Sequence, residues 1–161
     1  MAFQRATKTQ VKLRLALFGP SGSGKTYTSF RIASGIGGRI AVIDSERGSA
    51  SRYADRFIFD VDSPGDKTIK SYIQAINESA KAGYDVLIID SLSHAWKELL
   101  QEVERLARSK FKGNSWSAWS DGTPMQQTLV DAILSYPGHI IVTMRSKTEW
   151  IQEESGGKSK P

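Results

Sequence analysis

The sequence predicts an α/β protein with three layers, in which a mainly parallel sheet of five or more strands lies between helices. Three observations predict this class. Short runs of branched apolar residues alternate along the chain with helical patterns, which is typical of parallel sheets covered on both faces. The clearest of these runs end in a polar or acidic residue. A glycine-rich segment separates the first apolar run from the first predicted helix.

The first predicted strand covers residues 11–18, and a helix is predicted to open at Tyr27 and to reach Ser34. Between them runs the segment Gly19-Pro20-Ser21-Gly22-Ser23-Gly24-Lys25-Thr26. Its glycine spacing and its final Lys-Thr match the phosphate-binding P-loop pattern, and the strand–loop–helix setting is the context that this pattern requires. The same setting disfavours the alternative, a glycine-rich turn that binds nothing.

The chemistry of this segment follows from its residue types. Glycines let the backbone wrap closely around phosphates, and a helix N-terminus directs partial positive charge at an anion. We therefore predict that residues 19–27 bind a nucleoside triphosphate. Lys25 is expected to bridge the outer phosphates, and Thr26 is expected to be a ligand of Mg²⁺.

Four further strands are predicted, at residues 39–44, 56–61, 84–90 and 139–144. The third of these five strands has imperfect alternation, whereas the fourth contains four branched apolar residues in a row. Because ligands of parallel sheets bind at the carboxyl ends of the strands, the polar residues that follow the strands should converge around the P-loop.

Helices are predicted over residues 66–82, where isoleucines recur at helical spacing, and over residues 93–109. A further helix is predicted to begin at Thr123, which is a capping residue, with Pro124 in the first helical position. The intervening segment, residues 110–122, is predicted to be a polar loop that carries tryptophans.

The composition is that of a soluble globular protein. The chain has 161 residues, of which 39% are hydrophobic and 24% charged, and it has no cysteine, which excludes disulfides and thiolate metal sites. No apolar run approaches the roughly 20 residues of a membrane span. We expect a flexible arm at residues 1–10 without the apolar core of a secretory signal, one domain at 11–151 and a mobile polar tail at 152–161. A nucleotide motif favours a cytoplasmic location.

The charge balance is compatible with an anionic polymer as a partner. There are 22 Lys and Arg residues against 17 Asp and Glu, which gives a net charge of +5. Part of the excess lies in the tail, at Lys158 and Lys160.

Asp90 closes the fourth predicted strand and is predicted to hold the Mg²⁺ shell. The alternative is that Asp90 caps the following helix, a role that Ser91 or Ser93 would fill equally well.

Glu46 lies two residues beyond the second predicted strand and is predicted to polarise the water that attacks the γ-phosphate. Asp44 is the competing candidate for this role. A surface ion pair between Glu46 and Arg47 is the alternative without a catalytic role.

Three polar residues, Thr143, Arg145 and Lys147, are expected at or just beyond the tip of the fifth strand. Thr143 is positioned to sense the γ-phosphate. Arg145 or Lys147 would stabilise charge in the transition state, within its own subunit or across an interface; the alternative is that both are solvated cations. His94 and His139 show no metal-ligand spacing and are expected to be structural.

The predicted loop contains Lys110, Lys112, Trp116 and Trp119. Aromatic residues interleaved with lysines are suited to stacking on unpaired bases. The favoured alternative is that the tryptophans pack the loop onto the sheet or form a subunit contact.

Four segments together resemble the RecA-like ATPase core, and in particular the phage-encoded small RecA-like ATPases that include Sak-type single-strand annealing proteins. In chain order they are Gly19–Thr26, Ile43–Glu46, Leu87–Ser91 and Thr143–Lys147. The resemblance covers residues 11–151. RecA-like cores usually continue with a DNA-binding loop and further strands, whereas this sequence stops soon after the fifth predicted strand. We therefore expect either a shortened chain or an incomplete DNA-binding part.

The resemblance implies an ATPase that uses Mg²⁺, acts in recombination or single-strand annealing, binds single-stranded DNA and forms a homo-oligomer, as a ring or a filament. It implies that Glu46 is the catalytic base and that Thr143, Arg145 and Lys147 couple the nucleotide state to DNA.

Two other hypotheses remain open from the residues. One is a small-molecule phosphotransferase, which needs a mobile lid with several arginines; Arg105 and Arg108 lie on a predicted helix and substitute poorly for such a lid. The other is a non-catalytic module whose interactions depend on bound nucleotide. The sequence contains no guanine-specifying Asn-Lys-x-Asp run, which favours ATP.

Overall fold

The computed structural model describes residues 11–146. The predicted arm at 1–10, the predicted tail at 152–161 and Lys147 lie outside the described residues. The elements are β1 (Arg14–Gly19), α1 (Lys25–Ile36), β2 (Ile40–Asp44), a 3₁₀ helix (Ala50–Tyr53), β3 (Asp60–Asp62), α2 (Ile69–Lys81), β4 (Val86–Asp90), α3 (Ser93–Lys110), α4 (Ser115–Leu134) and β5 (His139–Arg145).

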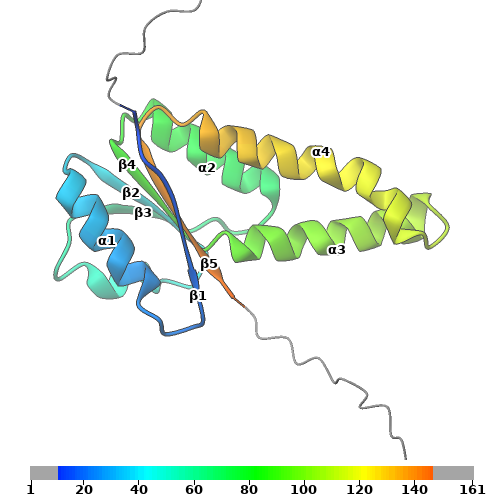
Figure 1. The fold of residues 1–161 in the computed structure, drawn as a ribbon, viewed down its shortest axis with the longest axis horizontal. Coiled ribbons are helices and arrows are strands. Elements are labelled where there is room, and N and C mark those ends of the chain that lie inside the picture. The colour runs from blue at the N-terminus through cyan, green and yellow to red at the C-terminus, as the bar shows by residue number, and fades with distance from the viewer. Residues whose placement is uncertain (1–10, 147–161) are drawn as a thin grey trace, which may run out of the picture.

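The five strands form one parallel sheet in the order β1-β5-β4-β2-β3. Helix α1 covers one face, and α2 and α4 cover the other (Figure 1). Strand β4 shows why its sequence is apolar throughout. Leu87 and Ile89 pack into the core under α2 and α4, whereas Val86 and Ile88 pack into the core under α1. The predicted three-layer α/β class with a parallel five-stranded sheet is confirmed.

The strand order brings distant segments of the chain together at one edge. Strand β5 lies between β1 and β4, so that Gly19 at the end of β1 pairs with Arg145. On the other side of β4, Asp44 pairs with Asp90. The carboxyl ends of β1, β5, β4 and β2 therefore lie side by side, as expected for a ligand site of a parallel sheet.

The third strand is shorter than predicted. Strand β3 covers only Asp60–Asp62, whereas the prediction was residues 56–61. Phe57 and Phe59 gave the segment its apolar pattern, but their rings pack against Phe30 of α1, with centroids 5.2 and 4.5 Å away. The apolar pattern of this segment therefore reflects packing against α1 rather than pairing with β2.

The prediction of a loop over residues 110–122 is wrong, because α4 begins at Ser115 and contains Pro124 in its interior. Asn114 caps the helix by accepting a hydrogen bond from the amide of Ser117, at 3.1 Å. The capping pattern at Thr123-Pro124 is overridden by packing, since α3 and α4 form a hairpin with its own small core. That core contains Leu99, Val103, Ala107 and Ala118.

The α3–α4 hairpin extends away from the sheet as an arm (Figure 1). With 18 residues, α3 is roughly 27 Å long, so the outer end of the arm is far from the sheet edge where α3 starts. Within residues 11–146, no helix combines the length and the apolar character that crossing a bilayer requires.

Candidate nucleotide site

The P-loop has the backbone that its glycines predict. Gly22 and Gly24 adopt positive φ angles of 79° and 81°, a conformation that glycine reaches without strain. Helix α1 then begins at Lys25. Its first turn contains no acidic residue, and its N-cap residue, Gly24, makes no side-chain hydrogen bond to the first amides. Its first amides thus remain available to an anion, as in other phosphate sites at helix N-termini.

The ammonium group of Lys25 lies over the loop. Its Nζ donates hydrogen bonds to the carbonyl oxygens of Gly19, at 3.0 Å, and Pro20, at 2.7 Å. A positive charge therefore stands inside the curve of the loop, close to the first amides of α1, where a phosphate chain would be received.

Asp90 joins the P-loop to β5. One of its oxygens, Oδ2, accepts a hydrogen bond from the hydroxyl of Thr26 at 2.7 Å, and Oδ1 accepts one from the hydroxyl of Thr143. Its side chain is buried. Asp90 does not cap α3, whose N-cap is Leu92, and the hydroxyl of Ser93 instead accepts a hydrogen bond from the amide of Arg145.

The residues present fit a magnesium ion. Mg²⁺ prefers hard oxygen ligands and is usually bound by one or two protein groups together with phosphates and water. The hydroxyl of Thr26 and the carboxylate of Asp90, which already contact each other, are such a pair.

The acid that closes β2, Asp44, and the acid two residues beyond it, Glu46, have different surroundings. Both oxygens of Asp44 accept backbone hydrogen bonds, from Glu46 at 2.7 Å and from Ala50 at 3.0 Å. Asp44 is 2% exposed and holds the turn that follows β2. This turn places the carboxylate of Glu46 next to Ser91 and Arg145, whereas the carboxylate of Asp44 is used to hold the backbone.

Each oxygen of Glu46 has its own partner. Oε1 accepts a hydrogen bond from the hydroxyl of Ser91 at 2.9 Å, and Oε2 forms an ion pair with the guanidinium of Arg145. The cation that pairs with Glu46 is thus Arg145 rather than the neighbouring Arg47, the partner considered from the sequence. Arg145 contacts an acid of its own chain, so it is not simply a solvated cation.

Comparison with known proteins identifies a family. A family model described as AAA domain matches residues 11–161. The chain belongs to this AAA-domain family. It is therefore a P-loop nucleotide-binding protein.

No curated protein matches the AAA-domain chain. Among solved structures, the crystal structure of the RadB recombinase is similar, with 19% sequence identity and a TM-score of 0.44. The similarity covers 81% of this chain and 60% of the RadB chain, so the AAA-domain chain matches less than two thirds of that protein's length.

Sequence analysis missed a second group of residues around Glu46 in the AAA-domain chain. The hydroxyl of Ser45 contacts the backbone amide and carbonyl of Ser91, each at 2.9 Å, and Nδ1 of His94 at 2.8 Å. Lys67 donates to the carbonyl of Ser45 at 2.7 Å. The serines directly beside Glu46 and Asp90 were the available signal, but nothing in a linear sequence pairs Ser45 with Ser91.

His94 lies next to Glu46, a placement that the sequence did not predict. Its Nδ1 lies 3.8 Å from Oε1 of Glu46. Burial lowers the pKa of His94, and the positive charge of Lys67 lowers it further. His139 is structural as expected, because its Nδ1 accepts a hydrogen bond from the amide of Leu13.

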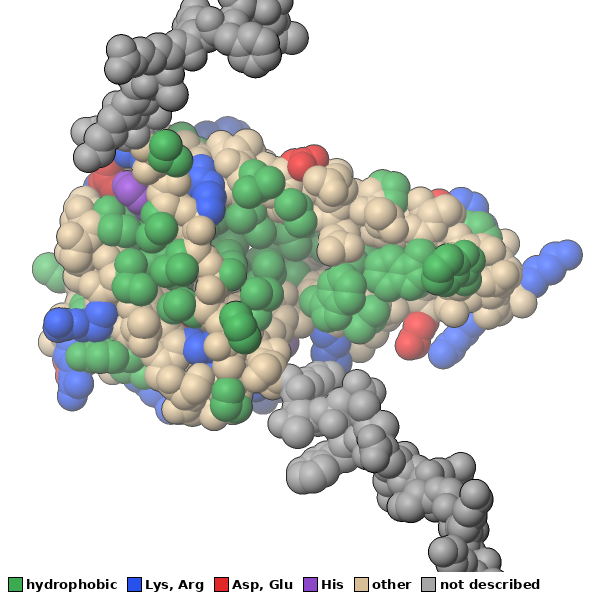
Figure 2. Space-filling view, in the orientation of Figure 1, with side chains coloured by type: hydrophobic (Ala, Val, Ile, Leu, Met, Phe, Trp, Pro, Cys, Tyr) green, Lys and Arg blue, Asp and Glu red, His purple; other side chains and the backbone are tan. Residues whose placement is uncertain are grey.

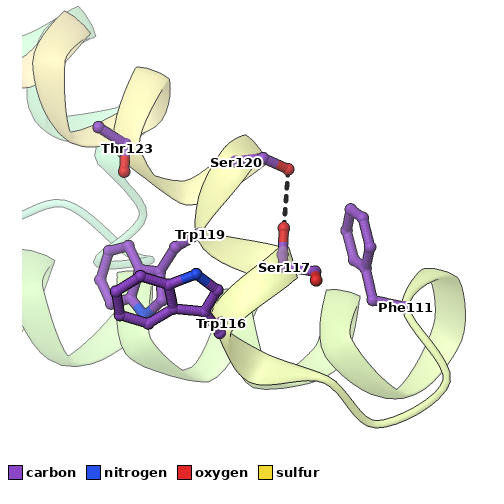
Figure 3. A pocket seen from close by; sticks show the side chains of 6 residues that line it. All are labelled: Phe111, Trp116, Ser117, Trp119, Ser120 and Thr123. Atoms are coloured by element: carbon purple, nitrogen blue, oxygen red, sulfur yellow. Dashed lines mark hydrogen bonds between the residues drawn. The ribbon is translucent and has the colours of Figure 1, made fainter.

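The residues considered for DNA lie on the arm rather than at the P-loop. Trp119 stacks on Trp96 of α3, with centroids 5.9 Å apart, so its packing agrees with the structural alternative. Trp116 is 87% exposed and borders an open hollow of about 800 Å³ with Phe111 on its other side (Figure 3). Lys110 forms an ion pair with Asp121 at 2.7 Å.

Proposed function

We propose that the AAA-domain chain is a RecA-like ATPase that binds ATP with Mg²⁺ and hydrolyses its terminal phosphate bond. The observation that carries the proposal is the hydrogen bond between Thr26 and Asp90, at 2.7 Å. It joins the P-loop to the end of β4 and puts a hydroxyl and a carboxylate together where a nucleotide's metal is needed.

The P-loop residues have binding roles in this proposal. The amides of the loop and of the first turn of α1 hold the phosphate oxygens, and Lys25 leaves the loop carbonyls for the outer phosphates. Thr26 and Asp90 hold the metal, and the hydroxyl of Thr143 fixes the other oxygen of Asp90. Held by Thr26 and Asp90, Mg²⁺ would supply positive charge that neutralises the terminal phosphates.

Glu46 is the general base of the reaction. It accepts a proton from water as the water oxygen bonds to the γ-phosphorus and the bond from that phosphorus to the β–γ bridging oxygen breaks. The products are ADP and inorganic phosphate. The position of Glu46 supports this role, since it is the acid beyond β2 whose carboxylate is not used to hold the backbone.

The test is ATP hydrolysis by the full chain with Mg²⁺. Glu46→Gln should lower kcat by about 10²–10⁴-fold, because the amide accepts no proton, while the binding of a non-hydrolysable ATP analogue persists. Glu104→Gln, the same change on the arm, is the matched control and should leave kcat unaltered. A Glu46→Gln variant with the parent's kcat would overturn the assignment of the base and favour the non-catalytic module.

We further propose that the protein acts on single-stranded DNA as an oligomer, in phage recombination or single-strand annealing. The net charge of +5 supports an anionic partner, and the exposed Trp116, four residues after Lys112 in the sequence, supports base stacking. In Figure 2, hydrophobic side chains gather on the arm, with Lys and Arg side chains near its outer end.

Tryptophan fluorescence tests the DNA proposal. An oligonucleotide should quench the fluorescence, and binding should weaken as salt rises, because phosphate contacts release counterions. Quenching should be much reduced in Trp116→Phe, in which the other tryptophans remain. Binding that is absent, or insensitive to salt, would rule out the annealing role while leaving ATP hydrolysis untouched.

A further inference from the structure

We propose that the two oxygens of Glu46 are controlled by two different residues. Ser91 is a positioning residue that holds Oε1, and Arg145 is a latch that occupies Oε2 until the terminal phosphate of the nucleotide draws the guanidinium away. The inference rests on the proposed ATP hydrolysis. Its consequence is that Glu46 becomes a free base only when a triphosphate is present.

The backbone of Ser91 is held firmly, which gives its hydroxyl a defined direction. The amide donates to the hydroxyl of Ser45, and the carbonyl accepts from the hydroxyls of Ser45 and Tyr72, each at 2.9 Å. Ser91 itself is 1% exposed. Its hydroxyl donates to Oε1 of Glu46, so one carboxylate oxygen is oriented by a rigid, buried group.

Whereas Ser91 is buried and held in place, the side chain of Arg145 is exposed and able to move. Its side chain is 47% exposed, and it is long enough to change partners without moving the backbone. The backbone is fixed at two points: Arg145 pairs with Gly19 in the sheet register, and its amide donates to the hydroxyl of Ser93. The latch is therefore anchored beside the first residue of the P-loop, within reach of both Glu46 and the phosphate site.

A terminal phosphate competes well for this guanidinium. It presents several charged oxygens in a geometry that arginine binds with two parallel hydrogen bonds. While Arg145 occupies Oε2, that oxygen is paired with a cation and is poorly suited to accept a proton. Once Arg145 transfers to the phosphate, Oε2 is free for water and Ser91 still holds the carboxylate by Oε1.

The alternative is that these contacts only fasten the turn after β2. That turn is already held by Asp44, which accepts hydrogen bonds from the amides of Glu46 and Ala50, and by the hydroxyl of Ser45 on Ser91. The carboxylate of Glu46 is thus not needed to hold the turn, which leaves its two contacts free for a function in the reaction.

Steady-state hydrolysis tests the role of Ser91. Ser91→Ala should lower kcat by about tenfold to a hundredfold with little change in KM, because a misplaced base costs rate rather than binding. Ser91→Thr, which keeps a hydroxyl, should restore most of kcat. In a Glu46→Gln background, Ser91→Ala should cause no further loss, since the two residues act through one carboxylate. An unchanged kcat in Ser91→Ala, or an additive loss in the double variant, would overturn the role.

Nucleotide affinity tests the latch. Glu46→Gln releases Arg145, so it should tighten the binding of a non-hydrolysable ATP analogue by about tenfold and leave the Kd of ADP unchanged. In an Arg145→Ala background, Glu46→Gln should have no such effect. If the gain persists there, simple repulsion between Glu46 and the phosphate explains it and the latch is wrong; an equal gain for ADP also contradicts it. Glu104→Gln is the charge-matched control.

Failure of the proposed ATP hydrolysis and failure of the roles given to Ser91 and Arg145 would be distinguishable. A parent chain that binds the ATP analogue but releases no phosphate contradicts the proposed hydrolysis. If the parent hydrolyses ATP but Ser91→Ala keeps its kcat, or Glu46→Gln still tightens binding of the ATP analogue in the Arg145→Ala background, only this inference is contradicted.

Discussion

The carboxyl edge of the sheet and the outer end of the α3–α4 arm are built in different ways. At the edge, polar side chains at or just beyond the ends of β1, β2, β4 and β5 bond to one another, and Asp90, Thr143 and Ser91 are each at most 3% exposed. At the end of the arm, two helices meet in a small separate core, and Trp116 points into solvent.

The difference shows where a short sequence pattern is sufficient to predict the position of a residue in the fold. A residue directly after a buried strand lies at the sheet edge whatever the neighbouring strands are, so chemistry can be assigned to it from its place in the sequence. A residue at the end of a helical hairpin is positioned by how the two helices pack, which no local pattern records. The predictions below test this contrast, from the largest expected effect to the smallest.

Lys25→Ala should have the largest effect, because it removes the charge inside the P-loop. We expect ATP hydrolysis to fall by at least about a hundredfold, with much weaker binding of an ATP analogue. Thermal unfolding should change little, since the ammonium group is partly exposed and bonds only to loop carbonyls and to Ser23. The matched control is Lys112→Ala on the arm, and an equal loss of hydrolysis in that variant would break the contrast between the two regions.

Trp119→Ala should destabilise the arm by about 2 kcal/mol, because the ring is partly buried and stacks on Trp96. Trp116→Ala should change the unfolding free energy by less than about 0.5 kcal/mol, since its ring is 87% exposed. Urea unfolding measures both. Equal destabilisation by the two variants would mean that Trp116 also packs on the protein and that the arm has no free aromatic residue there.

Gly122→Ala should destabilise the hairpin by about 1–3 kcal/mol through overpacking, because an added Cβ would stand 2.5 Å from Cγ2 of Val103. Gly35→Ala in α1 is the control, since nothing lies within 4 Å of the added Cβ and alanine favours helix. That variant should be stabilised slightly. Melting temperature reports both changes, and KM for ATP should stay constant in Gly122→Ala if the arm is independent of the P-loop.

Tyr72 provides a pH test of the sheet edge. Burial raises its pKa to about 12 from a usual value of 10.0, so the folded state binds its proton more tightly than the unfolded state does. This contribution to the free energy of unfolding, up to about 3 kcal/mol, is complete below pH 10 and is lost as pH rises towards 12. Tyr72→Phe should show a shallower loss of stability over this window in alkaline urea titrations. Identical slopes would show that the hydroxyl is solvated.

The predicted elements succeeded and failed for identifiable reasons. Strands β2 and β4 were predicted well because they are buried on both faces, which forces an apolar run that ends at an acid. The start of α4 was missed because Thr123-Pro124 carries a strong local signal, whereas the interhelical contacts that extend the helix to Ser115 come from α3. The aromatic residues before β3 were misassigned because packing on α1 and pairing in a sheet favour the same residue types.

The sequence alone determined the P-loop, the acids that follow β2 and β4 and the α/β class, because each depends on residues that are close together in the chain. The tertiary structure decided which of these groups touch. The insertion of β5 between β1 and β4 brings Thr143 to Asp90 and Arg145 to Glu46, across 53 and 99 positions of the chain. Contacts over such separations depend on strand order, which is a property of the packed sheet and leaves no mark in a local pattern.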